Sequence, residues 1–426
     1  MVNEEILHTV WKYRLYDPLR LKTCNGESVE VLYPGIHNTD AGPDFTNAKI
    51  KIGDTLWVGN VEIHLREEDW YAHGHHSDAA YNNTILHVVY STRNKSTKAR
   101  GENTINTVAL EEAILPTVTR QYYALMRQKK PIPCSGLLDK VDDITIRFTI
   151  ERMVMERLEQ KVNALTPLLE RYRYDWEQVF YIYVTRYLGA EVNKEPMQWL
   201  AERVPVKLIA KHADQLIQIE ALLFGASGML EHNHNDDYPR LLRKEFLYLK
   251  RLHHIVPLDY SVWKFLRLRP PHFPTLRIAQ LAALLHSRKL SFAAILACSN
   301  VNYIKDIFNV KTSEYWHTHY MFDKAAHQTK CSPGESVVHL IAINAVAPVL
   351  FAYGKYKGDE DICDRAVQLL QGCKPENNRF IRQWEEAGIH VSNASDTQGL
   401  LQLRQNYCNK LKCLQCGIGI QILKSG

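Results

Sequence analysis

Residues 42–65 read GPDFTNAKIKIGDTLWVGNVEIHL, and this stretch decides the fold of the N-terminal part of the chain. Apolar and charged residues alternate in AKIKI at 48–52, and a second strand-like run covers 56–65, which predicts two β-strands. The Gly53-Asp54 pair between them is typical of a tight hairpin turn. The stretch therefore predicts two antiparallel strands that carry acidic and histidine side chains.

Working outward, the same patterns predict an α+β protein with an N-terminal sheet domain followed by a large all-helical region. A helix opens the chain, with Asn3 as its N-cap. Further strands are predicted at 28–33, 84–90 and 105–110, and helices at 144–169, 176–188, 206–224, 239–252, 276–285 and from about 335 onward. We expect an α/β domain at 1–125, a helical domain at 137–325 and a C-terminal helical segment at 330–426 that carries a cysteine motif.

The composition is that of a folded protein, with 46% apolar and 10% aromatic residues among 426. The net charge of +5 is too small to identify a nucleic-acid binder by itself. Acidic residues near the start and an odd number of cysteines, nine, argue against a signal peptide and a disulfide framework, so we expect a cytoplasmic protein. The longest apolar stretch, 337–354, contains Asn344 and Pro348. We interpret it as a buried, kinked helix and expect no membrane partner.

The densest polar chemistry lies around Asp44, Glu62 and His64. Glu62 and His64 share one face of their strand because strand side chains alternate with period two. If Gly53 and Asp54 form the turn, strict pairing places Asp44 on the opposite face. One extra residue in the turn, or a bulge for which Gly59 is a suitable place, would bring the three side chains together.

Pro43-Asp44 followed after 17 residues by Glu62-Ile63-His64 resembles the motif of the PD-(D/E)xK, or restriction-endonuclease-like, nucleases. The predicted order of helix, three strands, helix and strand is similar to the core of that superfamily. The resemblance implies that Asp44 and Glu62 bind Mg²⁺ or Mn²⁺ and that His64 replaces the usual lysine.

The same resemblance suggests partners for the two carboxylates. Lys49 or Lys51 on the neighbouring strand would supply the missing positive charge, and Glu4 or Glu5 would complete the site. A second interpretation of the same residues does not depend on the resemblance to nucleases. His64 with His73, His76 and Asp78 offers the ligand types of a transition-metal site, although their spacing is not a recognised one.

Over nearly its whole length the chain also resembles a bacterial family of uncharacterised proteins, the domain-of-unknown-function family numbered 2851. The resemblance rests on DAGPDFTNAKIKIG, WVGNVEIHLREEDWYAHGHHSDAAYNNTILHVVY, IEALLFG, FPTLRIAQLAALL and the final cysteine motif. This family implies no settled activity.

Two features of the helical part point to ligands. The segment 238–270 is strongly basic, and Arg240, Arg243, Lys244, Lys250 and Arg251 fall on helix turns, where a phosphate backbone could bind. The alternative is a solvated helix face.

The second feature is the tail, where Cys408, Cys413 and Cys416 have the spacing C-x4-C-x2-C. This spacing suits a Zn or Fe–S site whose fourth ligand comes from a distance, with Cys373, Cys363, Cys331 or a histidine as candidates. Some nucleases of the superfamily named above carry Fe–S clusters on four cysteines. The alternative is three buried thiols without a metal.

The first hypothesis for function is a metal-dependent nucleic-acid hydrolase, a phosphodiesterase or nuclease, or a degenerate relative of one. The second is a non-catalytic nucleic-acid-binding or scaffold protein with a structural metal site. The sequence contains no phosphate-cradling glycine loop, nucleophile elbow or dinucleotide fingerprint, which argues against NTPase, serine-hydrolase and dehydrogenase classes.

Overall fold

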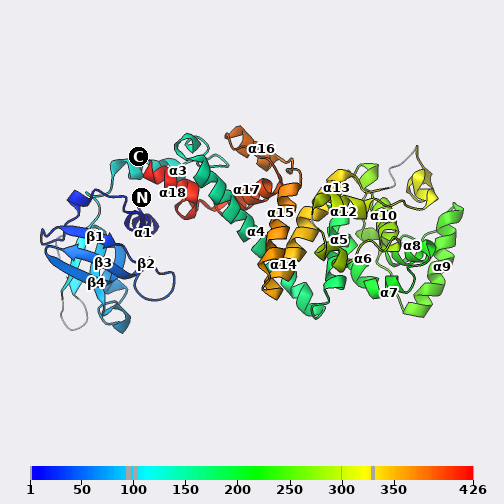
Figure 1. Ribbon diagram of the computed structural model, residues 1–426, viewed down its shortest axis with the longest axis horizontal. Coiled ribbons are helices and arrows are strands. Elements are labelled where there is room, and N and C mark those ends of the chain that lie inside the picture. The colour runs from blue at the N-terminus through cyan, green and yellow to red at the C-terminus, as the bar shows by residue number, and fades with distance from the viewer. Residues whose placement is uncertain (1, 93–96, 99–103, 299, 328–331, 426) are drawn as a thin grey trace. The chain divides into compact units, whose positions relative to one another are not determined.

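The computed structural model describes residues 2–92, 97–98, 104–298, 300–327 and 332–425. It confirms the α+β class, with a mixed sheet near the N-terminus followed by a helical region (Figure 1). The chain divides into two compact units. The first contains Met1–Thr149, Glu386–Gly388 and Leu403–Gly426, and the second contains Ile150–Glu385 and Ile389–Gln402. These bounds differ from the three expected segments, because the end of the chain packs with the sheet unit.

Helix α1 (Glu4–Tyr13) begins as predicted: the Asn3 side chain accepts a hydrogen bond from the N–H of Ile6 at 3.1 Å. Ile6 and Trp11 are buried, and the helix packs against strand β4 (Thr55–Arg66). The indole N–H of Trp11 donates to the carbonyl of Pro34 at 3.0 Å. These contacts fix the face that α1 presents to the sheet.

The sheet combines antiparallel and parallel pairing. Its strands follow the order β1-β3-β4-β5-β7-β6, with β2 also paired to β3. The first three strands of that order pair antiparallel, whereas β5 is parallel to β4 and β7 is parallel to β5. The strands not yet given are β1 (Val29–Tyr33), β2 (Ile36–His37), β3 (Phe45–Ile52), β5 (Thr84–Ser91), β6 (Thr97–Lys98) and β7 (Thr104–Ala109).

The β3–β4 hairpin contains a bulge. Near the turn, Ala48 pairs with Gly59, but Phe45 pairs with Val61, so β3 has one extra residue between these positions. Asn47 takes up that residue with a φ of 58°, a backbone conformation that asparagine tolerates better than most residues. Gly59 has a different role, because a Cβ there would lie 2.5 Å from the Ile85 side chain.

The crossover from β4 to the parallel strand β5 contains the histidine-rich segment. It passes through helix α2 (Asp69–Ala72) and the 3-10 turn η2 (Ala79–Tyr81). Trp70 is fully buried, with its ring centroid 5.4 Å from that of His75. The Tyr81 ring stacks against His75 at 3.9 Å. Two aromatic anchors thus hold this loop on the sheet unit.

The remainder of the first unit is helical. Helix α3 (Pro116–Met126) is followed by the 3-10 turn η3 (Leu138–Lys140), and the last helix, α18 (Gly417–Lys424), packs against both. Two short turns precede α18, namely η8 (Cys408–Lys410) and η9 (Cys413–Gln415). Figure 1 shows α18 beside α3, although the two helices are far apart in the sequence.

The second unit is built from helices around one apolar core. The helix expected at 206–224 is broken near His212, whose Nδ1 lies 2.7 Å from Gln218 Oε1, while the carbonyl of Ala213 faces His286 Nδ1 at 2.8 Å. These side-chain contacts replace the helical hydrogen bonds there. The helices are α4 (Asp143–Arg171), whose first turns belong to the first unit, α5 (Trp176–Leu188), α6 (Lys194–Arg203), α7 (Val206–Ala210), α8 (Leu216–Ala226), α9 (Asp237–His253), α10 (Pro274–His286), α11 (Phe292–Leu296), α12 (Val301–Phe308), α13 (Glu335–Ile341), α14 (Ala347–Lys357), α15 (Glu360–Gly372), α16 (Arg379–Glu386) and α17 (Ala394–Asn406).

The apolar stretch near residue 345 forms one long helical segment, Glu335–Lys357, through a π-helical turn at Ala342–Val346. Its length and hydropathy would allow it to cross a membrane, but 83% of its apolar window is buried in the protein. Such burial is typical of the core helix of a soluble protein. The π-helical turn lies directly before Pro348, which has no N–H to donate to a regular helix.

Candidate metal centre

The bulge brings Asp44 and Glu62 together, because it places position 44 opposite position 62 on the neighbouring strand. The N–H of Asp44 donates to Glu62 Oε2 at 3.0 Å, and the N–H of Ile63 donates to Asp44 Oδ2 at 2.9 Å. Each carboxylate is therefore held by the backbone beside the other. Glu62 is buried and Asp44 is about a quarter exposed.

Burial and, after it, the charge of Asp44 raise the pKa of Glu62 to about 8, against the opposing effect of the hydrogen bond from the Asp44 N–H. The charge of Glu4 on α1 adds to the increase. Glu62 therefore holds a proton at neutral pH in the absence of a cation. A divalent ion between the carboxylates would relieve the repulsion and release this proton.

Three histidines lie next to Glu62. His64, His73 and His75 each offer one ring nitrogen, and these three atoms lie within 4.8 Å of one another. His75 Nε2 is 3.2 Å and His64 Nε2 is 3.5 Å from Glu62 Oε1. The three imidazole nitrogens thus form a group of the kind that binds a transition metal, and Glu62 Oε1 lies beside two of them, those of His64 and His75.

Both nitrogens of His64 are engaged. Nδ1 lies 2.9 Å from Nε2 of His87 on β5, and Nε2 lies 3.2 Å from Nδ1 of His73. Burial, with the charges of neighbouring histidines, lowers the pKa of His64 to about 4 and that of His87 to about 3. Both rings are therefore neutral at pH 7. If His64 donates from Nδ1 to His87, its Nε2 carries a lone pair that faces His73 and could bind a metal placed between the two rings.

Helix α1 supplies two more groups. His8 Nε2 lies 3.3 Å from Asp44 Oδ2, and Glu4, one helical turn earlier, is close enough to affect Glu62. Glu5 points elsewhere, since its Oε1 accepts a hydrogen bond from Gln415 at 3.1 Å. Of the two acids proposed from the sequence, Glu4 is the one beside the site.

Two residues predicted for the site lie outside it. Lys49 pairs with Val58, four residues before Glu62 on β4, which corresponds to about 13 Å along the strand. The ring of His76 packs against Tyr71, with 5.4 Å between centroids.

Three residues of the site, His8, His75 and His87, were given no role in it from the sequence. His8 lies one helical turn after Glu4, and His87 lies on a predicted strand. Helix periodicity and strand pairing were therefore the signals available for these two. His75 lies in the irregular crossover, where no such signal exists.

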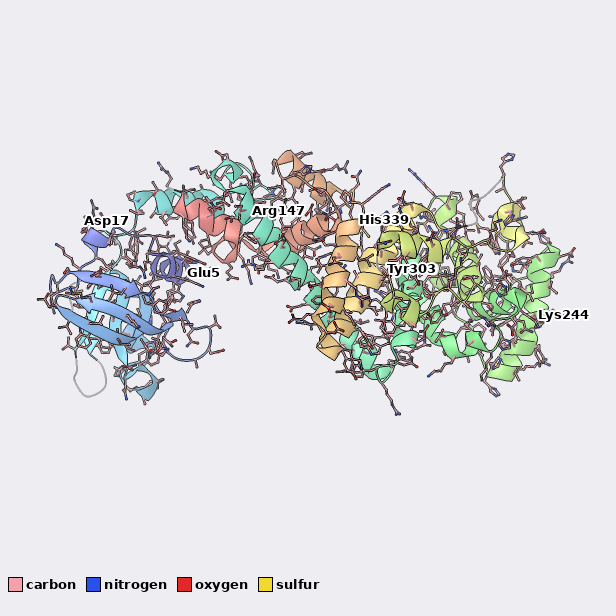
Figure 2. The ribbon with its side chains drawn as sticks, viewed as in Figure 1. Glu5, Asp17, Arg147, Lys244, Tyr303 and His339 are labelled. Atoms are coloured by element: carbon pink, nitrogen blue, oxygen red, sulfur yellow. The ribbon has the colours of Figure 1, made fainter. Side chains whose placement is uncertain are left out.

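The predicted basic residues on α9 do not all share one face. Arg240, Lys244 and Arg251 are exposed, and Lys244 projects from α9 in Figure 2. Arg243 and Lys250 are half-buried, and Arg243 donates to Asn233 at 3.1 Å. Apolar side chains are interleaved with the exposed cations. We define the α9 face as Arg240, Leu241, Lys244, Tyr248, Arg251 and Leu252, all exposed.

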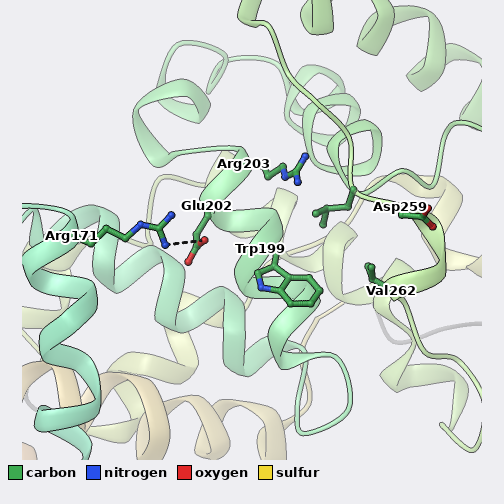
Figure 3. A pocket seen from close by; sticks show the side chains of 7 residues that line it. Arg171, Trp199, Glu202, Arg203, Asp259 and Val262 are labelled. Carbon is green, nitrogen blue, oxygen red and sulfur yellow. Dashed lines mark hydrogen bonds and ion pairs between the residues drawn. The ribbon is translucent and has the colours of Figure 1, made fainter.

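A pocket of about 600 Å³ lies elsewhere in the second unit, around the exposed ring of Trp199 (Figure 3). Arg171 pairs with Glu202 at 3.4 Å, and Arg203 donates to the carbonyl of Pro257 at 3.1 Å. Its arginines therefore serve structural contacts.

The fold and the site define an α+β protein whose sheet carries a candidate metal centre. The chain belongs to the family described as Protein of unknown function (DUF2851), whose model matches residues 4–379. No curated protein and no solved structure matches the chain. The matched range includes Asp44, Glu62 and the histidine cluster, whereas the cysteines of the tail follow it.

Proposed function

We propose that the sheet unit is a metal-dependent phosphodiesterase that hydrolyses nucleic acid. The observation that carries the proposal is the pair Asp44 and Glu62, fixed by each other's backbone beside three histidine nitrogens. The order α1, β1, β3, β4, α2, β5, with β5 parallel to β4, agrees with the order expected from the nuclease resemblance and supports it.

The residues fit a metal ion. His75 Nε2 is buried and makes no hydrogen bond within the described part of the chain, although it lies 3.2 Å from Glu62 Oε1. Buried polar atoms without a partner are rare and call for a ligand. Asp44, Glu62, His64, His73 and His75 would hold the ion. This donor set favours Mn²⁺ or Zn²⁺ over Mg²⁺, which prefers oxygen ligands and retains its waters.

When bound, the ion would supply Lewis-acid stabilisation of the phosphate and lower the pKa of water. The protein's own groups have separate tasks. Because both nitrogens of His64 are engaged, His64 fits a ligand rather than a base. His8 is partly exposed beside Asp44 and is the candidate general base. Replacing His8 with Gln should lower kcat and leave metal affinity nearly unchanged.

Hydrolysis of labelled DNA and RNA by the full-length protein in Mn²⁺, Zn²⁺ and Mg²⁺ tests the proposal. Asp44→Ala should reduce the rate by orders of magnitude while the protein remains folded. Asp54→Ala is the matched control, since Asp54 is exposed in the turn of the same hairpin. Absence of hydrolysis with every metal and substrate, despite metal binding, would contradict the enzyme.

The second candidate function is non-catalytic binding of nucleic acid, with a structural metal. The α9 face favours it, because exposed cations interleaved with Tyr248 offer phosphate contacts and a stacking surface. If the protein binds nucleic acid but leaves it uncleaved after prolonged incubation, this result would favour the second function over the first.

A further inference from the structure

Four cysteines from distant parts of the chain gather in the first unit. Cys134 lies between α3 and η3, whereas Cys408, Cys413 and Cys416 lie in the last turns before α18. All four are buried, with 7–8% of each residue exposed. The second unit, in contrast, contains Cys363 and Cys373, two of the distant ligands considered from the sequence, and Cys331 lies outside the described residues.

The local backbone is shaped to bring these side chains together. Helix α18 packs against η3, so the segment after Cys134 lies against the helix that Cys416 caps. The N–H of Leu137 donates to the carbonyl of Cys134 at 2.9 Å, and that of Cys416 donates to the carbonyl of Cys413 at 3.2 Å. Gly419 allows the close approach, because a Cβ there would lie 2.1 Å from the Cys413 carbonyl oxygen.

The thiols lie close enough for their charges to interact. Burial and, after it, the charges of Cys416 and Cys413 together raise the pKa of Cys134 to about 12. Burial, then charges on Cys134, Cys416 and Cys413, raise the pKa of Cys408, and the nearby cation of Arg404 opposes the increase. A bound metal would compensate the charges of four thiolates that are otherwise costly in a buried site.

The spacing of the cysteines distinguishes between metals. Structural zinc sites typically take their four ligands as two separate pairs, whereas three of these four cysteines lie in one run, C-x4-C-x2-C, with a single distant partner. Three closely spaced cysteines with one distant cysteine are the ligand pattern of plant-type iron–sulfur proteins.

We propose that Cys134, Cys408, Cys413 and Cys416 bind an iron–sulfur cluster that fastens the end of the chain to the segment after α3. Cys134 is the ligand that the tail lacks. The cluster is separate from the centre at Asp44 and Glu62, and it does not depend on the function proposed for that centre.

Anaerobic purification of the full-length protein, with reconstitution by ferrous iron and sulfide, tests the proposal. Iron, acid-labile sulfide and zinc are quantified, and visible absorption is followed on reduction. We expect iron and sulfide in similar amounts and an absorption band that bleaches. Labile sulfide also separates this cluster from iron bound at the histidines. Cys134→Ser should lose most of the sulfide, as Cys413→Ser should. Cys24→Ser is the matched control, because Cys24 is in the same unit but faces Thr92.

Retention of the full cluster by Cys134→Ser would overturn the assignment, as would zinc without iron or sulfide, or no metal after reconstitution. If the variants do not fold, alkylation of the wild-type protein followed by mass spectrometry replaces them. The proposal expects the four cysteines to be protected together and to become reactive together after chelation. Early reaction of Cys134 alone would contradict it.

Discussion

Asp44 and Glu62 are each hydrogen-bonded to the backbone of the other's strand. The Glu62 side chain accepts a hydrogen bond from the N–H of Asp44, and the Asp44 side chain accepts one from the N–H of Ile63, the residue after Glu62. Two acidic groups are thereby held side by side, and among the described residues no lysine forms an ion pair with either of them. The backbone hydrogen bonds stabilise both carboxylates, but they do not cancel the burial and the repulsion by Asp44 that raise the pKa of Glu62. A cation at this point would stabilise the folded unit as well as enable chemistry.

The first prediction concerns the pH dependence of metal binding. Because the pKa of Glu62 is about 8, a metal must displace its proton at lower pH. Mn²⁺ affinity should rise about tenfold per pH unit up to about pH 8 and then level off. Isothermal titration calorimetry at several pH values measures this. An affinity that stays constant between about pH 6 and pH 8 would show that Glu62 is not a ligand.

The raised pKa of Glu62 also leads to a prediction about the stability of the metal-free protein. The folded pKa of Glu62 lies above its unfolded value, so ionisation costs stability as the pH rises from about 4.5 to about 8. Glu62→Gln should therefore stabilise the metal-free protein at about pH 9 by a few kcal/mol and change little near pH 4. Urea denaturation of both proteins at the two pH values is the measurement. Equal stability at high pH would contradict the raised pKa.

The second prediction separates two adjacent histidines. His75 faces Glu62, whereas His76 packs against Tyr71. His75→Ala should weaken Zn²⁺ or Mn²⁺ binding by at least about tenfold, and His76→Ala should leave it unchanged. Equal losses in the two variants would place the metal elsewhere. Because His75→Ala also removes the ring against which Tyr81 stacks, thermal denaturation of both variants must show that the fold is retained.

The sequence predicted the hairpin but not the position of its bulge. Alternation and Gly53-Asp54 were sufficient to locate the strands and the turn, because these signals are local. The bulge depends on Asn47 adopting a positive φ and on its N–H facing Asn60 Oδ1 at 3.4 Å. Several residues could bulge in isolation, and the neighbouring strand decides which one does. Gly59 was a reasonable candidate for the bulge. In the structure, glycine is needed there for another reason, because a side chain would clash with Ile85 on β5.

The ligands that were not predicted from the sequence also depend on tertiary structure. No periodicity distinguishes His75 from His76, since the crossover loop is irregular and its course is set by the packing of Trp70. Cys134 lies in a segment that has the composition of a connector. Cys134 interacts with Cys413 only because helix α18, at the end of the chain, packs against the turn η3 that follows Cys134.

The third prediction concerns the α9 face. Lys244 and Arg251 are exposed on it, so replacing both with Glu should weaken nucleic-acid binding. The slope of log affinity against log salt should also become shallower, by about 0.9 for each phosphate of duplex DNA that the variant no longer neutralises. Fluorescence anisotropy at several salt concentrations measures the slope. Lys357→Glu, an exposed lysine at the end of α14, is the control. An unchanged slope in the double variant would exclude the α9 face.

The last prediction concerns a buried acid far along the chain from the metal centre. Glu220 on α8 is 1% exposed, and its Oε1 accepts a hydrogen bond from Ser313 at 2.8 Å. Burial raises its pKa to about 7, while hydrogen bonds from Ser313 and Tyr238 oppose the shift. Because the folded pKa exceeds the unfolded one, stability is fully present below about pH 4.5 and is lost as the pH rises through about 7.

Glu220→Gln keeps an oxygen that can accept from Ser313 and removes the charge. The variant should be more stable than the wild type at about pH 8, by up to about 3 kcal/mol, and equally stable near pH 4. Thermal and urea denaturation at both pH values provide the comparison. Glu245→Gln on α9, which is half-buried and accepts from Gln218 at 2.8 Å, is the comparison variant for removal of a carboxylate outside the core. A Glu220→Gln variant that is less stable at both pH values would show that the charged form is the one the core requires.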